Sequence, residues 1–333
     1  MKENKILTIS VAAYNLEKLI EQNLKSFVNS KYKEELEVLV IDDESTDDTA
    51  KVVEKYEKMY PNTIRLIKQK NGGPGSTVNN GIKNATGKYF KMVDGDDWVE
   101  TEDINKLIIK LRNIDTDMVI TNYEIYSEKD KKIIDIVRAN IKKDTELEFS
   151  EVCKQLYLQM HAIIFKTSLL QQNKIELDNG FYTDMEYALY PLPYVKTVMY
   201  LDLNIYVYRI ARAGQSVNIK SMQKNIKMHD EVLNNLISFY ERNKSSMSKN
   251  LSEYIAKRIA KMAWTETSIM LSFKDNKNMK EDIKKFILDL KSKSKEIYVS
   301  YKKINKAKII IYSKYTIINV MSRLKLLKVE KDA

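Results

Sequence analysis

Two clusters of acidic and hydroxyl side chains stand directly after apolar stretches of the sequence. The first covers residues 42–48 and reads Asp-Asp-Glu-Ser-Thr-Asp-Asp, and the second is Asp94-Gly95-Asp96-Asp97. Aspartate and serine are common in turns and helix caps, so one such cluster indicates little by itself. Two clusters at the same edge of a sheet would repel one another unless a cation or hydrogen-bond donors compensate their charge.

The chemistry that these clusters suggest is the binding of a hard divalent cation. Carboxylate oxygens without a nearby histidine are typical ligands of Mg²⁺ or Mn²⁺. Such an ion usually arrives bridging the phosphates of its substrate. The sequence therefore predicts a nucleoside diphosphate group that is held through Mg²⁺ or Mn²⁺.

The glycine-rich segment Gly72-Gly73-Pro74-Gly75 matches neither common phosphate-binding motif. It lacks the GxGxxG spacing of dinucleotide-binding enzymes. A P-loop has four residues between its glycines, whereas five separate Gly81 from Gly87, and Tyr89 stands where its Ser or Thr is needed. The glycines before Ser76 either bring backbone N–H groups to a ligand or form a plain turn.

Strand and helix signals alternate over the first hundred residues, and these elements must position the clusters. Apolar strand-like runs occur at residues 6–12, 36–41, 63–67 and 88–93, with helical spacing between them. This order predicts an α/β fold with a mainly parallel sheet flanked by helices. Ligands of such sheets bind beyond the carboxyl ends of the strands, where both acidic clusters fall.

The second half of the sequence changes character. Residues 118–126 and 133–137 indicate a hairpin, and residues 198–201 and 205–208 indicate two short strands. Glycine and proline are absent after residue 217, where helical periodicity dominates. We therefore expect a nucleotide-binding and catalytic domain at 1–217 and a helical region at 218–333.

The charge of the chain is concentrated near its C-terminus. The sequence has 56 basic and 46 acidic residues, a net charge of +10, and residues 291–333 carry +9 of it. A near-neutral body with a basic tail argues against a nucleic-acid binder. Cys153 is the only cysteine, which excludes an intramolecular disulfide and a cysteine zinc site.

The basic tail, residues 302–328, alternates apolar groups with lysines and has two interpretations. It is an interfacial helix attracted to anionic lipid, or a helix packed in a C-terminal bundle with solvated lysines. The chain has no stretch of about 18 uncharged apolar residues and no signal-peptide pattern at residues 1–12. We expect a cytoplasmic protein, with peripheral contact to the inner face of the plasma membrane and homo-oligomerisation both left open.

Four motifs in order resemble family 2 glycosyltransferases, whose fold is called GT-A. They are Ser10-Val11-Ala12-Ala13-Tyr14-Asn15, Asp42-Asp43-x-Ser45-x-Asp47, Asn71-Gly72-Gly73 with Asn80-Gly81, and the Asp-x-Asp motif of Asp94-Gly95-Asp96-Asp97. The segment around Asn80 resembles enzymes of bacterial surface-polysaccharide and teichoic-acid synthesis. The resemblance implies an inverting enzyme that moves a sugar from a UDP-sugar to an acceptor hydroxyl of an envelope glycan or lipid-linked glycan.

The resemblance also implies roles for residues in the first half. Tyr14 would lie against the base, Asp43 would accept a hydrogen bond from N3–H of uracil, and Asp94 would bind ribose or sugar hydroxyls. Asp96 would hold the metal, and Asp97 either orients the metal site or caps a helix. The nucleotide-binding residues expected here are Ala12, Tyr14, Asp43, Asn71, Asn80, Asp94 and Gly95. Asn79 stands where the family usually has arginine, which puts one cationic contact in doubt.

The second half would supply the general base and cover the diphosphate. Asp184 aligns with the family's base, unless it or Thr183 merely caps a helix. Glu186 would point elsewhere, because two helical residues are about 200° apart. Arg209, Arg212 and Ser216 resemble a loop that closes over the diphosphate. His161 either touches the acceptor or is a packed core histidine.

Two other classes of function stay open at this point. A nucleotidyltransferase also combines an acidic metal site with a nucleotide, but it releases pyrophosphate where a glycosyltransferase releases UDP. A degenerate module that only binds a glycan or nucleotide is the non-enzymatic alternative. The presence of Asp43, Asp94, Asp96 and Asp184 argues against that module.

Overall fold

The first half of the chain forms a parallel sheet from short, mostly apolar strands, three of which are almost wholly buried. The computed structural model describes residues 5–180, 182–211, 219–273 and 277–323. Strand β1 pairs in parallel with β2 and β4, and β2 pairs in parallel with β3. These strands are β1 (Leu7–Ala13), β2 (Leu36–Asp42), β3 (Ile64–Lys68) and β4 (Tyr89–Asp94).

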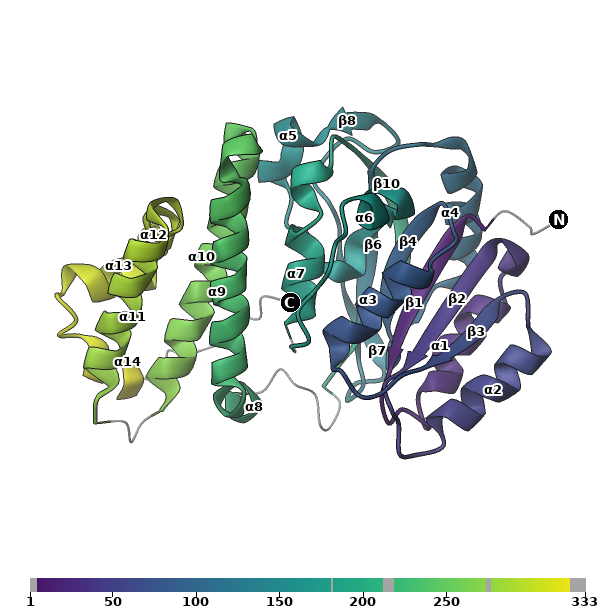
Figure 1. Cartoon of the computed structure of the whole chain (residues 1–333), viewed down its shortest axis with the longest axis horizontal. Helices are drawn as coiled ribbons and strands as arrows, with labels where there is room; N and C mark the ends of the chain where they lie inside the picture. The colour runs from purple at the N-terminus through teal and green to yellow at the C-terminus, as the bar shows by residue number, and fades with distance from the viewer. Residues whose placement is uncertain (1–4, 181, 212–218, 274–276, 324–333) are drawn as a thin grey trace. The chain divides into compact units, whose positions relative to one another are not determined.

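Helices connect these strands and pack on the sheet. The connections are α1 (Ile20–Val28), the 3-10 turn η1 (Lys33–Glu35), α2 (Thr49–Met59) and α3 (Pro74–Asn84). Helices α1 and α2 contact each other, and α3 lies in front of the sheet in Figure 1, against β1 and β2. Since every strand from β1 to β4 runs the same way, their carboxyl ends meet at one edge, as expected from the sequence.

The second half of the sheet is mixed in direction. The strands follow the order β3-β2-β1-β4-β9-β6-β10-β5, with β7 paired to β6 and β8 paired to β10. Strand β9 runs antiparallel to both β4 and β6, whereas β10 runs parallel to β6. The added strands are β5 (Trp98–Val99), β6 (Met118–Ser127), β7 (Lys132–Val137), β8 (Glu146–Glu148), β9 (Ile163–Lys166) and β10 (Thr197–Ile210).

One expectation about these strands is wrong. Residues 198–201 and 205–208 do not form two separate strands but parts of the single strand β10. The pairing of β10 with β6 shifts register between Tyr200 and Tyr206, so the strand carries a bulge where the sequence pattern breaks. The hairpin of β6 and β7 is confirmed.

Short helices fill the connections of this half. They are α4 (Thr101–Asn113), α5 (Phe149–Val152), η2 (Cys153–Gln155), η3 (Met160–Ala162), α6 (Thr167–Gln172), α7 (Thr183–Leu189) and η4 (Leu192–Tyr194). Helix α4 packs on β10, and α6 packs on α3 and β9. The predicted α/β architecture is therefore present, with α7 placed before the last long strand.

The chain divides into two compact units, residues 1–213 and 214–333. The expected boundary at residue 217 falls in 212–218, outside the described residues. The described part of the second unit is helical: α8 (Ile219–Lys224), α9 (Ile226–Asn243), η5 (Lys244–Ser246), α10 (Lys249–Ser272), α11 (Met279–Lys293), α12 (Lys295–Tyr301), α13 (Asn305–Tyr312) and α14 (Ile318–Arg323).

The described part of the basic tail packs within this helical unit. Helix α12 lies against α10, where the Tyr301 hydroxyl is 2.8 Å from Thr267 Oγ1. Tyr301, Ala307, Ile310 and Ile318 are fully buried. The described tail residues Ala307, Ile310 and Ile318 are thus packed, as the bundle interpretation expects. In the ranges that the structure describes, no helix is both long and apolar enough to span a bilayer.

Candidate active site

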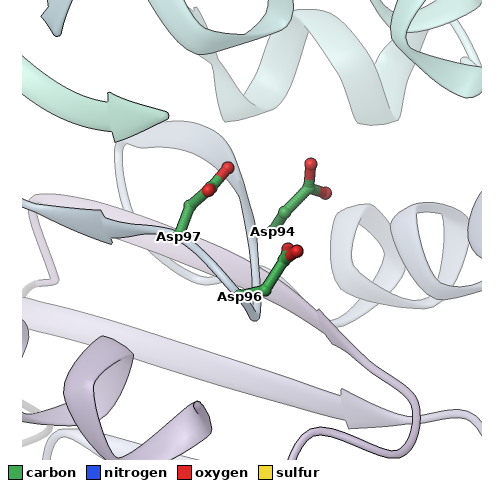
Figure 2. Close-up of side chains that lie close together, drawn as sticks. All are labelled: Asp94, Asp96 and Asp97. Carbon is green, nitrogen blue, oxygen red and sulfur yellow. The ribbon is translucent and has the colours of Figure 1, made fainter. Parts of the chain in front are cut away.

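Three aspartates project from one tight turn at the carboxyl end of β4. Asp94 is the last residue of the strand, and Asp96 and Asp97 follow it before β5. One carboxylate oxygen from each lies within 4.8 Å of the others (Figure 2). Asp94 and Asp96 are half-buried, whereas Asp97 is buried. We call Asp94–Asp97 the aspartate turn.

The aspartate turn is held by the neighbouring strand and by α1. Gly95 N–H donates to the Ala12 carbonyl at 3.1 Å, and the Asn23 amide donates to the Asp94 and Asp97 carbonyls at 3.2 and 2.9 Å. A Cβ at position 95 would lie 2.7 Å from the Ala12 oxygen, so only glycine allows this approach. Ala12 thus meets the turn through its backbone.

Asp97 orients the aspartate turn and does not cap a helix. The Tyr206 hydroxyl donates to Asp97 Oδ2 at 2.5 Å, and Arg209 N–H donates to Oδ1 at 2.8 Å. Burial, together with the carboxylates of Asp96 and Asp94, raises the pKa of Asp97 well above its ordinary value. Both oxygens of Asp97 are therefore engaged by β10.

Asp184 lies close to the aspartate turn, as the sequence predicts. It is half-buried in the first turn of α7. Burial raises the pKa of Asp94 to about 7, with further contributions from the Asp96 and Asp184 carboxylates. The carboxylates of Asp94, Asp96 and Asp184 therefore interact electrostatically, and like charges that interact in this way favour a bound cation.

Glu186 points away from this region. Its Oε2 accepts from Asp178 N–H at 2.8 Å, and its Oε1 accepts from the Tyr190 hydroxyl at 3.1 Å. The side chain is fully buried, so it serves the packing of α7. Asp184 and Glu186 therefore have different surroundings, as expected for two helical residues that are about 200° apart.

Arg209 is buried against the aspartate turn, which does not fit its expected contact with a diphosphate. Its Nε donates to the Asp96 carbonyl at 2.8 Å, Nη1 to Glu128 at 2.5 Å and Nη2 to Gln22 at 2.6 Å. The guanidinium also stacks on Trp98 at 4.8 Å. All three nitrogens have protein partners, so we assign Arg209 to positioning the turn. Arg212 and Ser216 lie outside the described residues.

Asp43 follows β2 and fastens the glycine-rich loop. Its Oδ1 accepts from Gly72 N–H at 3.0 Å and from the Gln69 amide at 2.7 Å, and its Oδ2 accepts from Gly73 N–H at 3.0 Å. The two glycine N–H groups therefore serve Asp43 and not a phosphate. Gly73 has φ +83°, a conformation that favours glycine.

The other expected nucleotide residues surround this loop. The Asn71 amide donates to the Asp43 carbonyl at 3.0 Å, and the Asn80 amide donates to Gln69 at 2.9 Å. Tyr14 stands at the end of β1 and is 50% exposed, which leaves its ring accessible. Gln69, which links Asp43 to Asn80, was missed because a single glutamine after a strand carries no sequence signal.

His161 is a packed core histidine, the second of its two interpretations. Its ring lies 5.0, 4.7 and 4.4 Å from the rings of Tyr123, Tyr206 and Tyr208. Burial, and then the charge of Lys91, lowers its pKa to about 3, so the ring is neutral. The fully buried Lys91, whose Nζ donates to the His161 carbonyl at 2.6 Å, was also missed by sequence reasoning.

The fold and the acidic site agree with a family of glycosyltransferases. A family model for glycosyl transferase family 2 matches residues 8–173, about half of the chain. The chain is 32% identical over 171 residues to a poly(ribitol-phosphate) beta-glucosyltransferase of Bacillus spizizenii. That match covers 51% of this chain and 26% of the relative. The chain belongs to glycosyltransferase family 2.

Two further similarities agree with this family. The chain is 25% identical over 224 residues to the glycosyltransferase GlyA of Streptococcus pneumoniae, a match of 63% of this chain and 31% of that protein. The chain therefore spans about a third or less of these two curated relatives. Residues 1–349 of Staphylococcus aureus TarS, solved in complex with UDP-GlcNAc, share the fold with a TM-score of 0.67 and 19% identity, covering 96% of this chain and 91% of that one.

Proposed function

We propose that this chain is an inverting glycosyltransferase that moves a sugar from a UDP-sugar to an acceptor hydroxyl. The observation that carries the proposal is the aspartate turn at the carboxyl edge of the sheet, where the Asp184 carboxylate is near enough to help raise the pKa of Asp94. The relatives named above add support, since one acts on a poly(ribitol phosphate) and a structural neighbour binds UDP-GlcNAc.

Asp43 has room for one more hydrogen bond. An ionised carboxylate offers about four acceptor positions, and three described donors use both positions of Oδ1 and one of Oδ2. The remaining position suits N3–H of uracil, which cytosine lacks. The exposed ring of Tyr14 would cover the flat base.

Asp94 and Asp96 are the residues that would hold a divalent cation. Their oxygens are close together, histidine and cysteine are absent from the cluster, and Asp97 is already engaged by β10. This donor set fits Mg²⁺ or Mn²⁺. When bound, such an ion would neutralise the charge of the diphosphate as it leaves. Asp94 would also accept hydrogen bonds from ribose or sugar hydroxyls.

Asp184 would act as the general base. Its carboxylate would take the proton of the acceptor hydroxyl while that oxygen forms a bond to the anomeric carbon. The bond from the anomeric carbon to the diphosphate oxygen breaks in the same displacement, and UDP leaves with the electron pair. The sugar is transferred with inversion, and no covalent glycosyl-enzyme forms.

The acceptor would be a glycan of the bacterial envelope, either a surface polymer, a teichoic acid or a lipid-linked precursor. Peripheral contact with the inner face of an anionic membrane would bring the chain to such an acceptor. Helix α13 supports this contact, because Lys308, Ile309 and Tyr312 are exposed within an arc of about 100°. Ile309 is 49% exposed and Tyr312 68% exposed. Basic, aromatic and aliphatic side chains together suit an anionic lipid interface.

A panel of UDP-sugars and other nucleotide-sugars tests the proposal, with nucleotide release measured in the presence of Mn²⁺, Mg²⁺ or EDTA. We expect release of UDP from a UDP-sugar only with a divalent cation. Release of pyrophosphate in the presence of a nucleoside triphosphate and a sugar phosphate would support the nucleotidyltransferase alternative. UDP binding without any release, over a broad set of acceptors, would favour the binding module.

A further inference from the structure

Residues 177–179 lie between α6 and α7 in the chain and are hydrogen-bonded to α3, and we call them the strap. The Asn79 side chain of α3 pairs with the backbone of Leu177 in both directions. Its Nδ2 donates to the Leu177 carbonyl, and its Oδ1 accepts from Leu177 N–H, each at 2.8 Å. The side-chain amide of Asn79 thus bonds the Leu177 backbone as a neighbouring β-strand would. These two hydrogen bonds fix both the position and the direction of the strap.

The glycine-rich loop is shaped to receive the strap. A Cβ at Gly73 would lie 2.2 Å from the Asn179 carbonyl oxygen, and a Cβ at Gly75 would lie 1.6 Å from the Asp178 carbonyl oxygen. Real Cβ atoms do not approach backbone so closely, so glycine at these two positions allows the strap to lie directly on the loop. The same loop holds Asp43 through the N–H groups of Gly72 and Gly73.

The other side of the strap is fixed to α7. Glu186, which is fully buried, accepts from Asp178 N–H at 2.8 Å. A Cβ at Gly75 would also lie 3.1 Å from Thr183 Cγ2, at the first residue of α7. The strap is therefore joined to α3 by Asn79, lies on the glycine-rich loop, and is joined to the helix of Asp184 by Glu186.

We propose that Asn79 and Glu186 are positioning residues that fix Asp184 relative to the donor site through the strap. The inference rests on the proposed function, because it concerns the base of that reaction. Neither side chain needs to touch the donor or the acceptor. Asn79, which stands where the family usually has arginine, would instead hold α7 and Asp184 in place relative to the glycine-rich loop.

The variant Asn79→Ala tests this proposal with two measurements. Hydrogen exchange should become faster in the amides of 177–180 and 182–186, because the strap loses both bonds to α3. Turnover should fall by about 10- to 100-fold, the cost of a base displaced by about 1 Å. The dissociation constant of UDP in Mn²⁺ should stay within about twofold of the wild type, since Asp43 and the aspartate turn keep their own partners.

Two further variants sharpen the test. Asn79→Asp keeps an acceptor for Leu177 N–H but loses the donor to the carbonyl, so its exchange and turnover should fall between those of Asn79→Ala and the wild type. Asn113→Ala is the matched control. It removes one amide bond to a helix carbonyl at the end of α4, 3.0 Å long, and should change neither measurement.

Unchanged hydrogen exchange in the amides of 177–180 and 182–186 of Asn79→Ala would contradict the claim that Asn79 holds the strap. Faster exchange with wild-type turnover would overturn its role in positioning the base, and an equal loss of UDP affinity and turnover would show that Asn79 serves the donor. A wild-type chain that transfers no sugar from any UDP-sugar overturns the proposed function. Even in that case, the hydrogen-exchange measurement still shows whether Asn79 holds the strap in place.

Discussion

Each carboxylate of the site is distinguished by its partners. Asp97 is engaged by Tyr206 and the Arg209 backbone, and Asp43 is engaged by the glycine-rich loop. Asp94, Asp96 and Asp184 are half-buried, and the carboxylates of Asp96 and Asp184 help to raise the pKa of Asp94. The residue types alone predicted the acidic cluster, but they could not tell which members are structural, because that depends on contacts with β10.

Asp184→Asn should separate binding from chemistry. Asparagine has nearly the same shape but cannot take the proton of the acceptor. Sugar transfer should fall by about 10²–10⁴, the usual contribution of a positioned general base. The affinity for UDP should barely change, which calorimetry can measure on the same sample. Full activity of this variant would mean that another group is the base.

Glu186 gives a prediction about pH and stability. Burial, and then the hydrogen bond and charge of Asp178, raises its pKa from 4.5 to about 8. The neutral form fits the fold, so its contribution to stability is complete below about pH 4.5 and is lost as the pH rises to about 8. Glutamine resembles the neutral form. The melting temperature of Glu186→Gln relative to the wild type should therefore rise between pH 5 and pH 8, and an equal difference at both pH values would contradict the assignment.

At the scale of elements, local patterns predicted much of the fold but not its long-range contacts. The alternation of strands and helices placed both acidic clusters at the carboxyl edge correctly. The sequence did not reveal the bulge of β10, the Asn23 bonds to the aspartate turn or the strap on the glycine-rich loop. Each of these joins residues that are 70 or more positions apart or breaks a periodic pattern.

Gly75→Ala tests the contact of α3 with the strap. In an ordinary exposed helix this change would stabilise by about 1 kcal/mol. Here the new Cβ would meet the Asp178 carbonyl, so we expect destabilisation by about 1–3 kcal/mol in urea unfolding. Lys83→Ala, at an exposed position of the same helix, is the control and should be close to neutral. If Gly75→Ala is more stable than the wild type, the strap can move away from the new Cβ without lowering the free energy of unfolding, and the close contact is not required.

At the scale of the whole molecule, the net charge of +9 in residues 291–333 shapes what can approach the C-terminal region. The described tail is packed up to residue 323, so truncation near residue 290 would remove the fully buried Ile297, Tyr301 and Ile310. Removing the tail would therefore expose core surface as well as remove charge. Substitutions on the exposed face of α13 are a cleaner test of membrane contact.

The full chain should bind anionic vesicles at low salt and release them as salt rises, because each basic group near the surface contributes about 1 kcal/mol that salt screens. The double variant Ile309→Ser, Tyr312→Ser should bind more weakly in co-sedimentation. Ile134→Ser, which removes an equally exposed isoleucine of β7, should not. If the full chain does not bind anionic vesicles at either low or high salt, the membrane contact is excluded.

Metal-dependent binding of UDP is the most direct test of a nucleotide site built on the aspartate turn. Calorimetry should be run on the wild type, Asp96→Asn and the control Asp135→Asn, an exposed aspartate of β7, each in Mn²⁺ and in EDTA. We expect the wild type and the control to bind UDP only with Mn²⁺, and Asp96→Asn to lose this binding while its melting temperature is kept. Equal UDP affinity in Mn²⁺ and EDTA, or an unaltered affinity in Asp96→Asn, would contradict a nucleotide site built on the aspartate turn.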